Sequence, residues 1–190
     1  MTIDCEREVV RKIAVNRLHL VTIGSYVQPM DLILWRHADA VPLKNESEPD
    51  SQRRLTGKGR KQAAHVAEWL ERHLPDSTKV LVSPALRARE TAESLDRKIQ
   101  IVPELIPGAT AAHILIAAGW PDNRHPVLIV GHQPALGQVA ALLLFGEERN
   151  MSIRKAAAWW ITNRAREDEE MPLTRHTRHS LRAAVSPDYL

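Results

Sequence analysis

Two arginines and two histidines are spaced so that together they can hold and transfer a phosphoryl group. The pair Arg36-His37 directly follows one short apolar run, Arg87 lies about one helical turn after another, and His132 follows a third. An arginine guanidinium can bind phosphate oxygens through two parallel hydrogen bonds. An imidazole that is neutral at pH 7 can attack phosphorus if its other nitrogen is fixed by a hydrogen bond. These four residues are our candidates for phosphate chemistry.

The apolar runs that precede the four candidates are predicted to be strands of one sheet. Residues 31–35, 79–82 and 127–130 are rich in apolar side chains, as strands buried on both faces require. Amphipathic stretches lie between them, and this alternation is typical of β-α-β units in a mostly parallel sheet. Ligands bind beyond the carboxyl ends of such strands. We therefore expect the candidates to meet at that edge of the sheet.

The remaining elements complete a three-layer α/β/α domain with a mostly parallel central sheet. Thr56 is the expected N-cap of a helix that runs to about His73, with one apolar face. The other expected helices are 85–95, 111–118 and 135–144, and the other expected strands are 99–102, 156–162 and 180–185. The last two strands should form a C-terminal β-hairpin with a charged connection at 164–178. Residues 38–55 are polar and contain proline, so we expect a loop there.

Size and composition indicate one soluble domain in a reducing compartment. The chain has 190 residues, 44% of them hydrophobic, which is enough for one sizeable core. A single cysteine excludes an intramolecular disulfide framework and a thiolate metal cluster, so we expect a cytoplasmic protein. No apolar run approaches the roughly 20 residues that span a bilayer, so no membrane association is expected. Aromatic content of 4% without a basic stripe argues against nucleic acid as the partner.

Residues 1–29 do not share the alternating pattern of the rest. They place polar and charged residues within an otherwise apolar stretch, and Met30 stands immediately before the first predicted strand. We expect residues 1–29 to be an N-terminal extension outside the native fold. Met30 is then either the initiator or the start of the fold, and the domain is predicted at 30–190.

Five segments resemble, in order, the signatures of the histidine phosphatase superfamily, whose fold is phosphoglycerate mutase-like. Within it they are most similar to the SixA-type phosphohistidine phosphatases. Trp159-Trp160 and the segment 181–187 also look SixA-like, so the resemblance covers the chain from about residue 30 to its end. One departure is Ala38, where many members have glycine. The five segments are 34–40 (Leu-Trp-Arg-His-Ala-Asp-Ala), 54–63, 80–91, 102–105 and 128–134.

The resemblance implies a phosphatase in which His37 is phosphorylated transiently while Arg36, Arg87 and His132 hold the phosphoryl oxygens. Covalent catalysis of this kind divides one difficult displacement into two. The implied partner is a phosphohistidine-bearing protein, such as a phosphotransfer domain or a phosphocarrier. No cofactor is implied. No carboxylate-histidine cluster has metal-ligand spacing, so a metal-free reaction is expected.

Glu104 matches the position of the glutamate that serves as general acid in related mutases and phosphatases. The match is incomplete, because Leu-Ile-Pro-Gly follows here, whereas those relatives continue with glycine and a further acidic stretch. Two interpretations stay open: Glu104 donates a proton to the leaving group, or it only caps the turn. Asp39 is the other nearby carboxylate, and we expect it to order the loop after His37.

Two other functions remain open. The same four residues could hydrolyse small phosphomonoesters, or the chain could be a module that binds phosphoproteins without hydrolysis, which would need the nucleophile to be lost or misplaced. The lack of the long insertions that cover the pocket in small-molecule relatives favours a protein substrate. Five basic residues form either a rim near the pocket or a solvated face: Arg53, Arg54, Lys58, Arg60 and Lys61.

Overall fold

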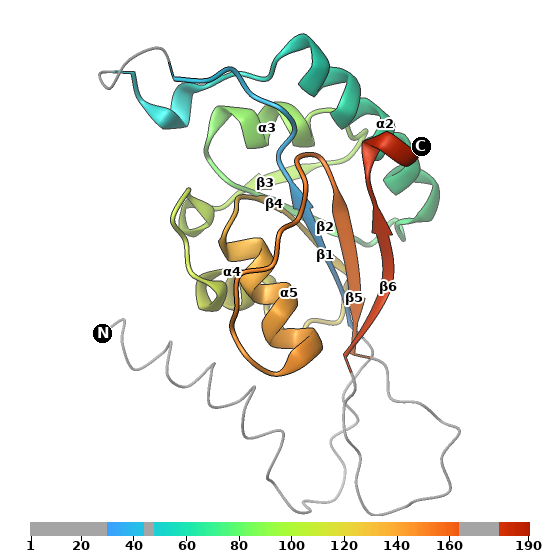
Figure 1. The fold of residues 1–190 in the computed structure, drawn as a ribbon. Helices are drawn as coiled ribbons and strands as arrows, with labels where there is room; N and C mark the ends of the chain where they lie inside the picture. The colour runs from blue at the N-terminus through green and yellow to red at the C-terminus, as the bar shows by residue number, and fades with distance from the viewer. Residues whose placement is uncertain (1–29, 44–47, 164–178) are drawn as a thin grey trace, which may run out of the picture.

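A six-stranded sheet runs through the computed structural model, which describes residues 30–43, 48–163 and 179–190 (Figure 1). Within these residues the strand order is β3-β2-β4-β1-β5-β6. The first four strands in this order are mutually parallel, β5 is antiparallel to β1, and β6 is antiparallel to β5. This confirms the mostly parallel sheet and the antiparallel C-terminal pair. The strands are β1 (Asp31–Arg36), β2 (Lys79–Val82), β3 (Ile99–Ile101), β4 (Val127–Gly131), β5 (Ala158–Thr162) and β6 (Ser180–Val185).

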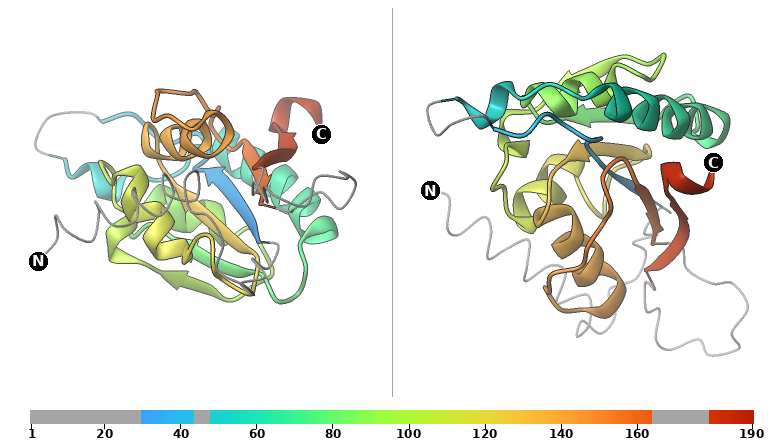
Figure 2. Two further views of the ribbon diagram at one scale, coloured as in Figure 1. Left: turned by 90° about the horizontal axis from the view of Figure 1, so that it is seen from below. Right: turned by 45° about the horizontal axis from the view of Figure 1, so that its top comes forward.

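Helices cover both faces of this sheet, which gives the predicted three layers (Figure 2). One face carries α2 (Gly57–His73) and α3 (Leu86–Ala92), and the other carries α4 (Ala111–Ala118) and α5 (Ala135–Phe145). In the described part of the chain, no helix is long and apolar enough to cross a membrane. Three short 3-10 helices complete the fold: η1 (Asp50–Gln52), η2 (Pro103–Leu105) and η3 (Pro187–Tyr189).

Side-chain alternation along β1 divides the core into two halves. Leu32 and Leu34 pack in the cluster formed with α4 and α5, whereas Ile33 and Trp35 pack in the cluster formed with α2 and α3. All four side chains are fully buried. Because both faces of the strand are covered, its sequence is continuously apolar rather than alternating.

Three predicted boundaries differ from the structure, each for a local reason. The helix predicted at 85–95 ends at Ala92, because the amides of Ser94 and Leu95 bond to carbonyls three residues back. The strand predicted at 156–162 begins at Ala158, because Ala156 has a φ of 59°, which interrupts extended backbone. The predicted loop at 38–55 contains η1 and one antiparallel bridge.

Met30 is part of the fold. It is 1% exposed, its N–H donates to Asn163 Oδ1 at 2.5 Å, and its carbonyl accepts the Asn163 N–H at 3.2 Å. Met30 is therefore anchored to the residue that follows β5. The predicted N-terminal extension, 1–29, and the predicted charged connection, 164–178, lie outside the described residues.

The loop after β1 packs directly on the first turn of α2. Thr56 is the N-cap, as predicted, and its hydroxyl oxygen accepts the Gly59 N–H at 2.9 Å. Its own N–H donates to the Asp39 carbonyl at 3.0 Å. A Cβ on Gly59 would lie 1.9 Å from that carbonyl oxygen, whereas a Cβ on Gly57 would meet no atom within 4 Å. The absence of a side chain at Gly59 therefore allows the helix to approach the loop that follows His37.

We expect Gly59→Ala to lower the free energy of unfolding by about 1–3 kcal/mol, the usual cost of overpacking. Gly57→Ala is the matched control. It should be neutral or stabilising by up to about 1 kcal/mol, because alanine restricts the unfolded chain more than glycine does. Urea unfolding of the two variants measures the difference, and equal stabilities would contradict the close approach.

Candidate active site

The ends of β1 and β4 bring His37 and His132 together. Arg36, the last residue of β1, pairs in register with Gly131, the last residue of β4. The His37 N–H donates to the Gly131 carbonyl at 3.0 Å, so His37 and His132 follow adjacent strand ends. Their ring centroids are 5.1 Å apart.

Arg87 reaches the same edge of the sheet from the first turn of α3. The strand β2 lies on the other side of β4, and the Ser83 N–H donates to the Val130 carbonyl at 3.0 Å where the chain leaves β2. The Arg87 side chain is 3% exposed, and its Nε–H donates to His37 Nε2 at 3.3 Å. All four residues predicted from the sequence therefore meet at one edge of the sheet.

The hydrogen bonds of His37 define which ring nitrogen is available for attack. Nδ1 lies 2.8 Å from the Ala38 carbonyl oxygen, which can only accept, so Nδ1 carries the proton. Nε2 faces the Arg87 Nε–H, which can only donate. His37 therefore presents the lone pair of Nε2 toward Arg87.

Burial keeps both histidines neutral at pH 7. It is the largest cause that lowers the pKa of His37 to about 4, and the nearby charges of Arg87 and Arg36 act in the same direction. The Ala38 hydrogen bond opposes this shift. The pKa of His132 falls to about 3, again through burial first and then through the neighbouring His37 and Arg87. His132 can therefore act as a neutral hydrogen-bond donor rather than as a cation.

Two buried polar atoms at this edge, Arg36 Nε and His132 Nδ1, have no hydrogen-bond partner in the described part of the chain. The Arg36 Nη1 donates to the Ile153 carbonyl at 2.7 Å, which anchors the guanidinium. His132 Nε2 lies 2.8 Å from the hydroxyl of Ser83, which accepts the Ala85 N–H at 3.2 Å and can donate its own proton to Nε2. When Ser83 donates to Nε2, the His132 proton lies on Nδ1, so that Arg36 Nε–H and His132 Nδ1–H are two donors suited to an oxyanion.

Asp50 is a site residue that the sequence did not reveal. Its carboxylate and its carbonyl accept two N–H groups of Arg87, at 2.7 and 2.6 Å, and the carboxylate also accepts Arg53 Nε–H at 2.8 Å. Burial raises the pKa of Asp50, but the hydrogen bonds from Arg87 and Arg53 outweigh it, so the pKa lies below its ordinary value. Asp50 orients Arg87 while leaving other guanidinium N–H groups available.

The loop after His37 is held by side chains from three other segments. The Ala38 N–H donates to Thr91 Oγ1 at 3.0 Å. The carboxylate of Asp39 accepts the Lys155 ammonium at 2.6 Å and the Thr56 hydroxyl at 2.9 Å. The hydrogen bond from Lys155 is the main cause of a lowered pKa at Asp39. Asp39 orders the loop, as the sequence indicated.

Glu104 lies in η2, which follows the edge strand β3. Its side chain is exposed, and it makes no hydrogen bond or ion pair with any described residue. No contact of Glu104 with a described residue therefore supports either the general-acid interpretation or the turn-capping one. The role of Glu104 stays a prediction.

Known proteins resemble this chain in both sequence and fold. Residues 32–110 match the histidine phosphatase superfamily (branch 1). The phosphohistidine phosphatase SixA of Escherichia coli strain K12 is 31% identical over 139 residues, which cover 68% of this chain and 83% of SixA. An uncharacterized protein of Picosynechococcus sp. is 31% identical over 171 residues, 85% of this chain and 99% of its own. A solved structure of the protein histidine phosphatase SixA with tungstate has a TM-score of 0.61 at 25% identity, covering 84% of this chain and 99% of that chain.

The chain belongs to the histidine phosphatase superfamily, as its sequence motifs indicated. Membership makes it a hydrolase of the phosphatase class, with histidine-based catalysis that needs no metal ion. The fold alone does not define the substrate. A phosphoserine phosphatase mutant of Entamoeba histolytica has a TM-score of 0.60 at 16% identity, a likeness of fold only.

The lowered pKa values predict that the His37 and His132 rings stay neutral from pH 8 down to about pH 5. A histidine in water would instead pass its midpoint near pH 6.5. The ring Cε1–Hε1 signals of both residues, followed by NMR, should therefore hardly move over this range. In His37→Ala the pKa of His132 should rise, because a neighbour that lowers it is removed. A midpoint near pH 6.5 for His37 in the unmodified protein would contradict this account.

Proposed function

We propose that this protein is a phosphohistidine phosphatase, which removes the phosphoryl group from a phosphorylated histidine of a partner protein. A phosphotransfer domain or a phosphocarrier is the expected kind of partner. The observation that carries the proposal is the neutral His37 ring, whose Nε2 lone pair faces Arg87 Nε–H, at a strand edge that also holds the unpartnered Arg36 Nε and His132 Nδ1. The 31% identity to a phosphohistidine phosphatase supports this substrate class.

The proposed reaction has two steps with His37 as the nucleophile. In the first step His37 Nε2 attacks phosphorus, and the P–N bond to the substrate imidazole breaks. The positive charge that develops on the His37 ring is stabilised by the Ala38 carbonyl, which accepts the Nδ1–H. In the second step water attacks the phosphoryl group on His37, which releases inorganic phosphate and restores the neutral ring.

The phosphoryl oxygens bind to donors that are already in place. Arg36 Nε–H and His132 Nδ1–H are each free to bind one oxygen. Arg87 Nε–H leaves His37 Nε2 as phosphorus approaches and turns to a phosphoryl oxygen, while Asp50 keeps hold of the other side of the guanidinium. Fixed donors of this kind stabilise the charge that spreads over the equatorial oxygens.

The chemistry of the leaving group favours phosphohistidine over a phosphate ester. An alkoxide leaving group needs a proton, but Asp39 and Asp50 have lowered pKa values and are ionised at pH 7. Phosphohistidine can take a proton from water on its other ring nitrogen, so that neutral imidazole leaves. Its transfer to His37 also replaces one P–N bond by another. A site in which Asp39 and Asp50 are both ionised is therefore sufficient for this substrate, whether or not Glu104 donates a proton.

We expect the purified protein to hydrolyse a phosphohistidine protein with a higher kcat/KM than sugar phosphates. His37→Ala should abolish the reaction, because it removes the nucleophile, whereas His125→Ala, at an exposed histidine, should leave it unchanged. Glu104→Gln should change the rate on phosphohistidine by less than about twofold, because that leaving group needs no enzyme acid. Release of inorganic phosphate measures all these rates.

Retained hydrolysis in His37→Ala would refute the assignment of the nucleophile. Faster turnover of sugar phosphates than of the phosphohistidine protein would favour the phosphomonoesterase alternative. A large loss in Glu104→Gln on phosphohistidine would show that Glu104 acts as the general acid.

A further inference from the structure

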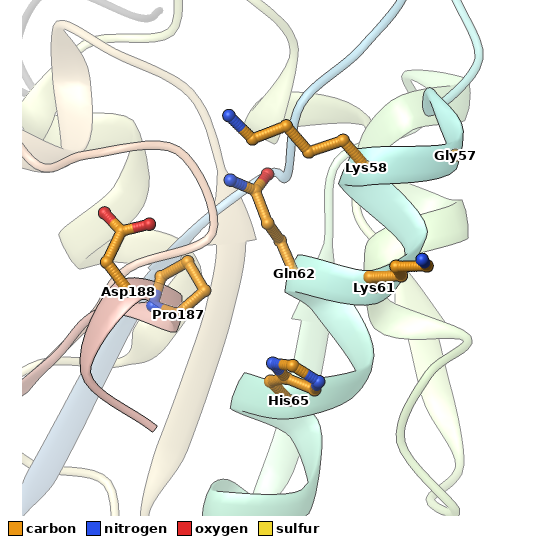
Figure 3. Close-up of a pocket in the computed structure, with 7 residues that line it drawn as sticks. All are labelled: Gly57, Lys58, Lys61, Gln62, His65, Pro187 and Asp188. Atoms are coloured by element: carbon orange, nitrogen blue, oxygen red, sulfur yellow. The ribbon is translucent and has the colours of Figure 1, made fainter.

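A cleft of about 520 Å³ lies beside the active-site loop, between α2 and η3 (Figure 3). These two elements are far apart in sequence but adjacent in the fold, where the C-terminal turn packs near α2 (Figures 1 and 2). The volume is in the range of ligand-binding clefts. The cleft contains none of the four residues proposed to handle the phosphoryl group. Its walls include Lys58, Lys61, Gln62 and His65 of α2 and Asp188 of η3.

Gln62 connects this cleft to the phosphoryl site. Its side-chain oxygen accepts the Asp39 N–H at 3.2 Å, two residues after His37, and its amide NH₂ donates to no described residue. In Figure 3 the side chains of Lys58 and Gln62 both extend from α2 toward the loop that leaves β1. A protein segment in the cleft would therefore be adjacent to a side chain that contacts the loop directly after His37.

The structure separates the five basic residues that the sequence placed near the start of α2. Arg53 is bound to Asp50 in the active site. Arg54 and Arg60 both pair with Glu90, at 3.5 and 3.7 Å. These three arginines are therefore already engaged with carboxylates.

Lys58 and Lys61 are the two basic residues of that group left at the cleft. Both are exposed, and neither makes an ion pair with a described residue. The carboxylates at the border of the cleft, Asp39 and Asp188, are already paired with the cations at 154–155. The charge of Lys58 also contributes to the lowered pKa of Asp39. Together with Lys61 it gives the cleft an excess of positive charge next to the phosphoryl site.

We propose that this cleft binds an acidic segment of the phosphorylated partner protein, next to the phosphohistidine itself. Lys58 and Lys61 pair with its carboxylates, and the Gln62 amide donates a hydrogen bond to its backbone. The inference rests on the proposed function and adds the chemistry of the partner to it. Because exposed charges act mainly on encounter, the cleft should affect KM and salt dependence more than the chemical step.

The test compares two double variants in which lysine charges are reversed. The cleft variant carries Lys58→Glu and Lys61→Glu, and the control variant carries Lys79→Glu and Lys98→Glu. The control pair is also exposed but lies at the amino ends of β2 and β3, away from the active-site edge. The cleft variant should lose about tenfold or more in kcat/KM on a phosphohistidine protein at low salt, through KM. Its hydrolysis of free phosphohistidine should be unchanged, and the control variant should match the unmodified protein on both substrates. An equal loss on both substrates, or no loss on the protein, would overturn the proposal.

Binding of poly-L-glutamate gives a second readout that does not depend on hydrolysis. It should shift the amide signals of residues 57–65 in NMR spectra of the unmodified protein but not of the cleft variant, and poly-L-lysine should have no effect. No shift, or a stronger response to a single-stranded RNA, would overturn the acidic-segment proposal without touching the phosphatase assignment. Shifts in a protein that does not hydrolyse phosphohistidine would support the acidic ligand and refute the proposed function.

Discussion

The hydrogen bond from His37 Nδ1–H to the Ala38 carbonyl is the interaction on which the proposed chemistry depends. It places the lone pair on Nε2, at the side of the ring that faces Arg87. Burial lowers the pKa of the ring to about 4, so the lone pair stays free at neutral pH. The parallel register of β1 and β4 then holds His132 beside it. The strand geometry positions His37 Nε2, the tautomer leaves its lone pair free, and burial keeps it unprotonated.

Keeping two arginines and two histidines together in a buried place is costly, and the surrounding structure offsets part of that cost. Asp50 accepts two N–H groups of Arg87, and the Ile153 carbonyl anchors Arg36. Two polar atoms of the site, Arg36 Nε and His132 Nδ1, have no hydrogen-bond partner in the described part of the chain. Buried donors without partners lower stability, so a site of this kind gives up stability for affinity toward an oxyanion.

The sequence predicts those parts of the site that carry a local signal. The strands that end at Arg36 and Gly131 are buried on both faces, so their apolar runs are visible without a structure. Asp50 gives no such signal, because its role depends on Arg87, 37 residues further along the chain. The bond from Ser83 to His132 likewise exists only because β2 and β4 pair. The positive φ at Ala156, which shortens β5, could not be predicted either, because alanine does not favour that conformation.

In the proposed reaction, Nε2 of His37 carries the phosphoryl group during turnover. The most direct test is to quench the enzyme in alkali during reaction with a phosphohistidine protein and to locate the phosphoryl group by peptide mass spectrometry and ³¹P NMR. We expect a phosphoryl group on His37, attached at Nε2. Attachment at Nδ1, attachment to His132, or the absence of any phosphorylated enzyme during rapid turnover would contradict it.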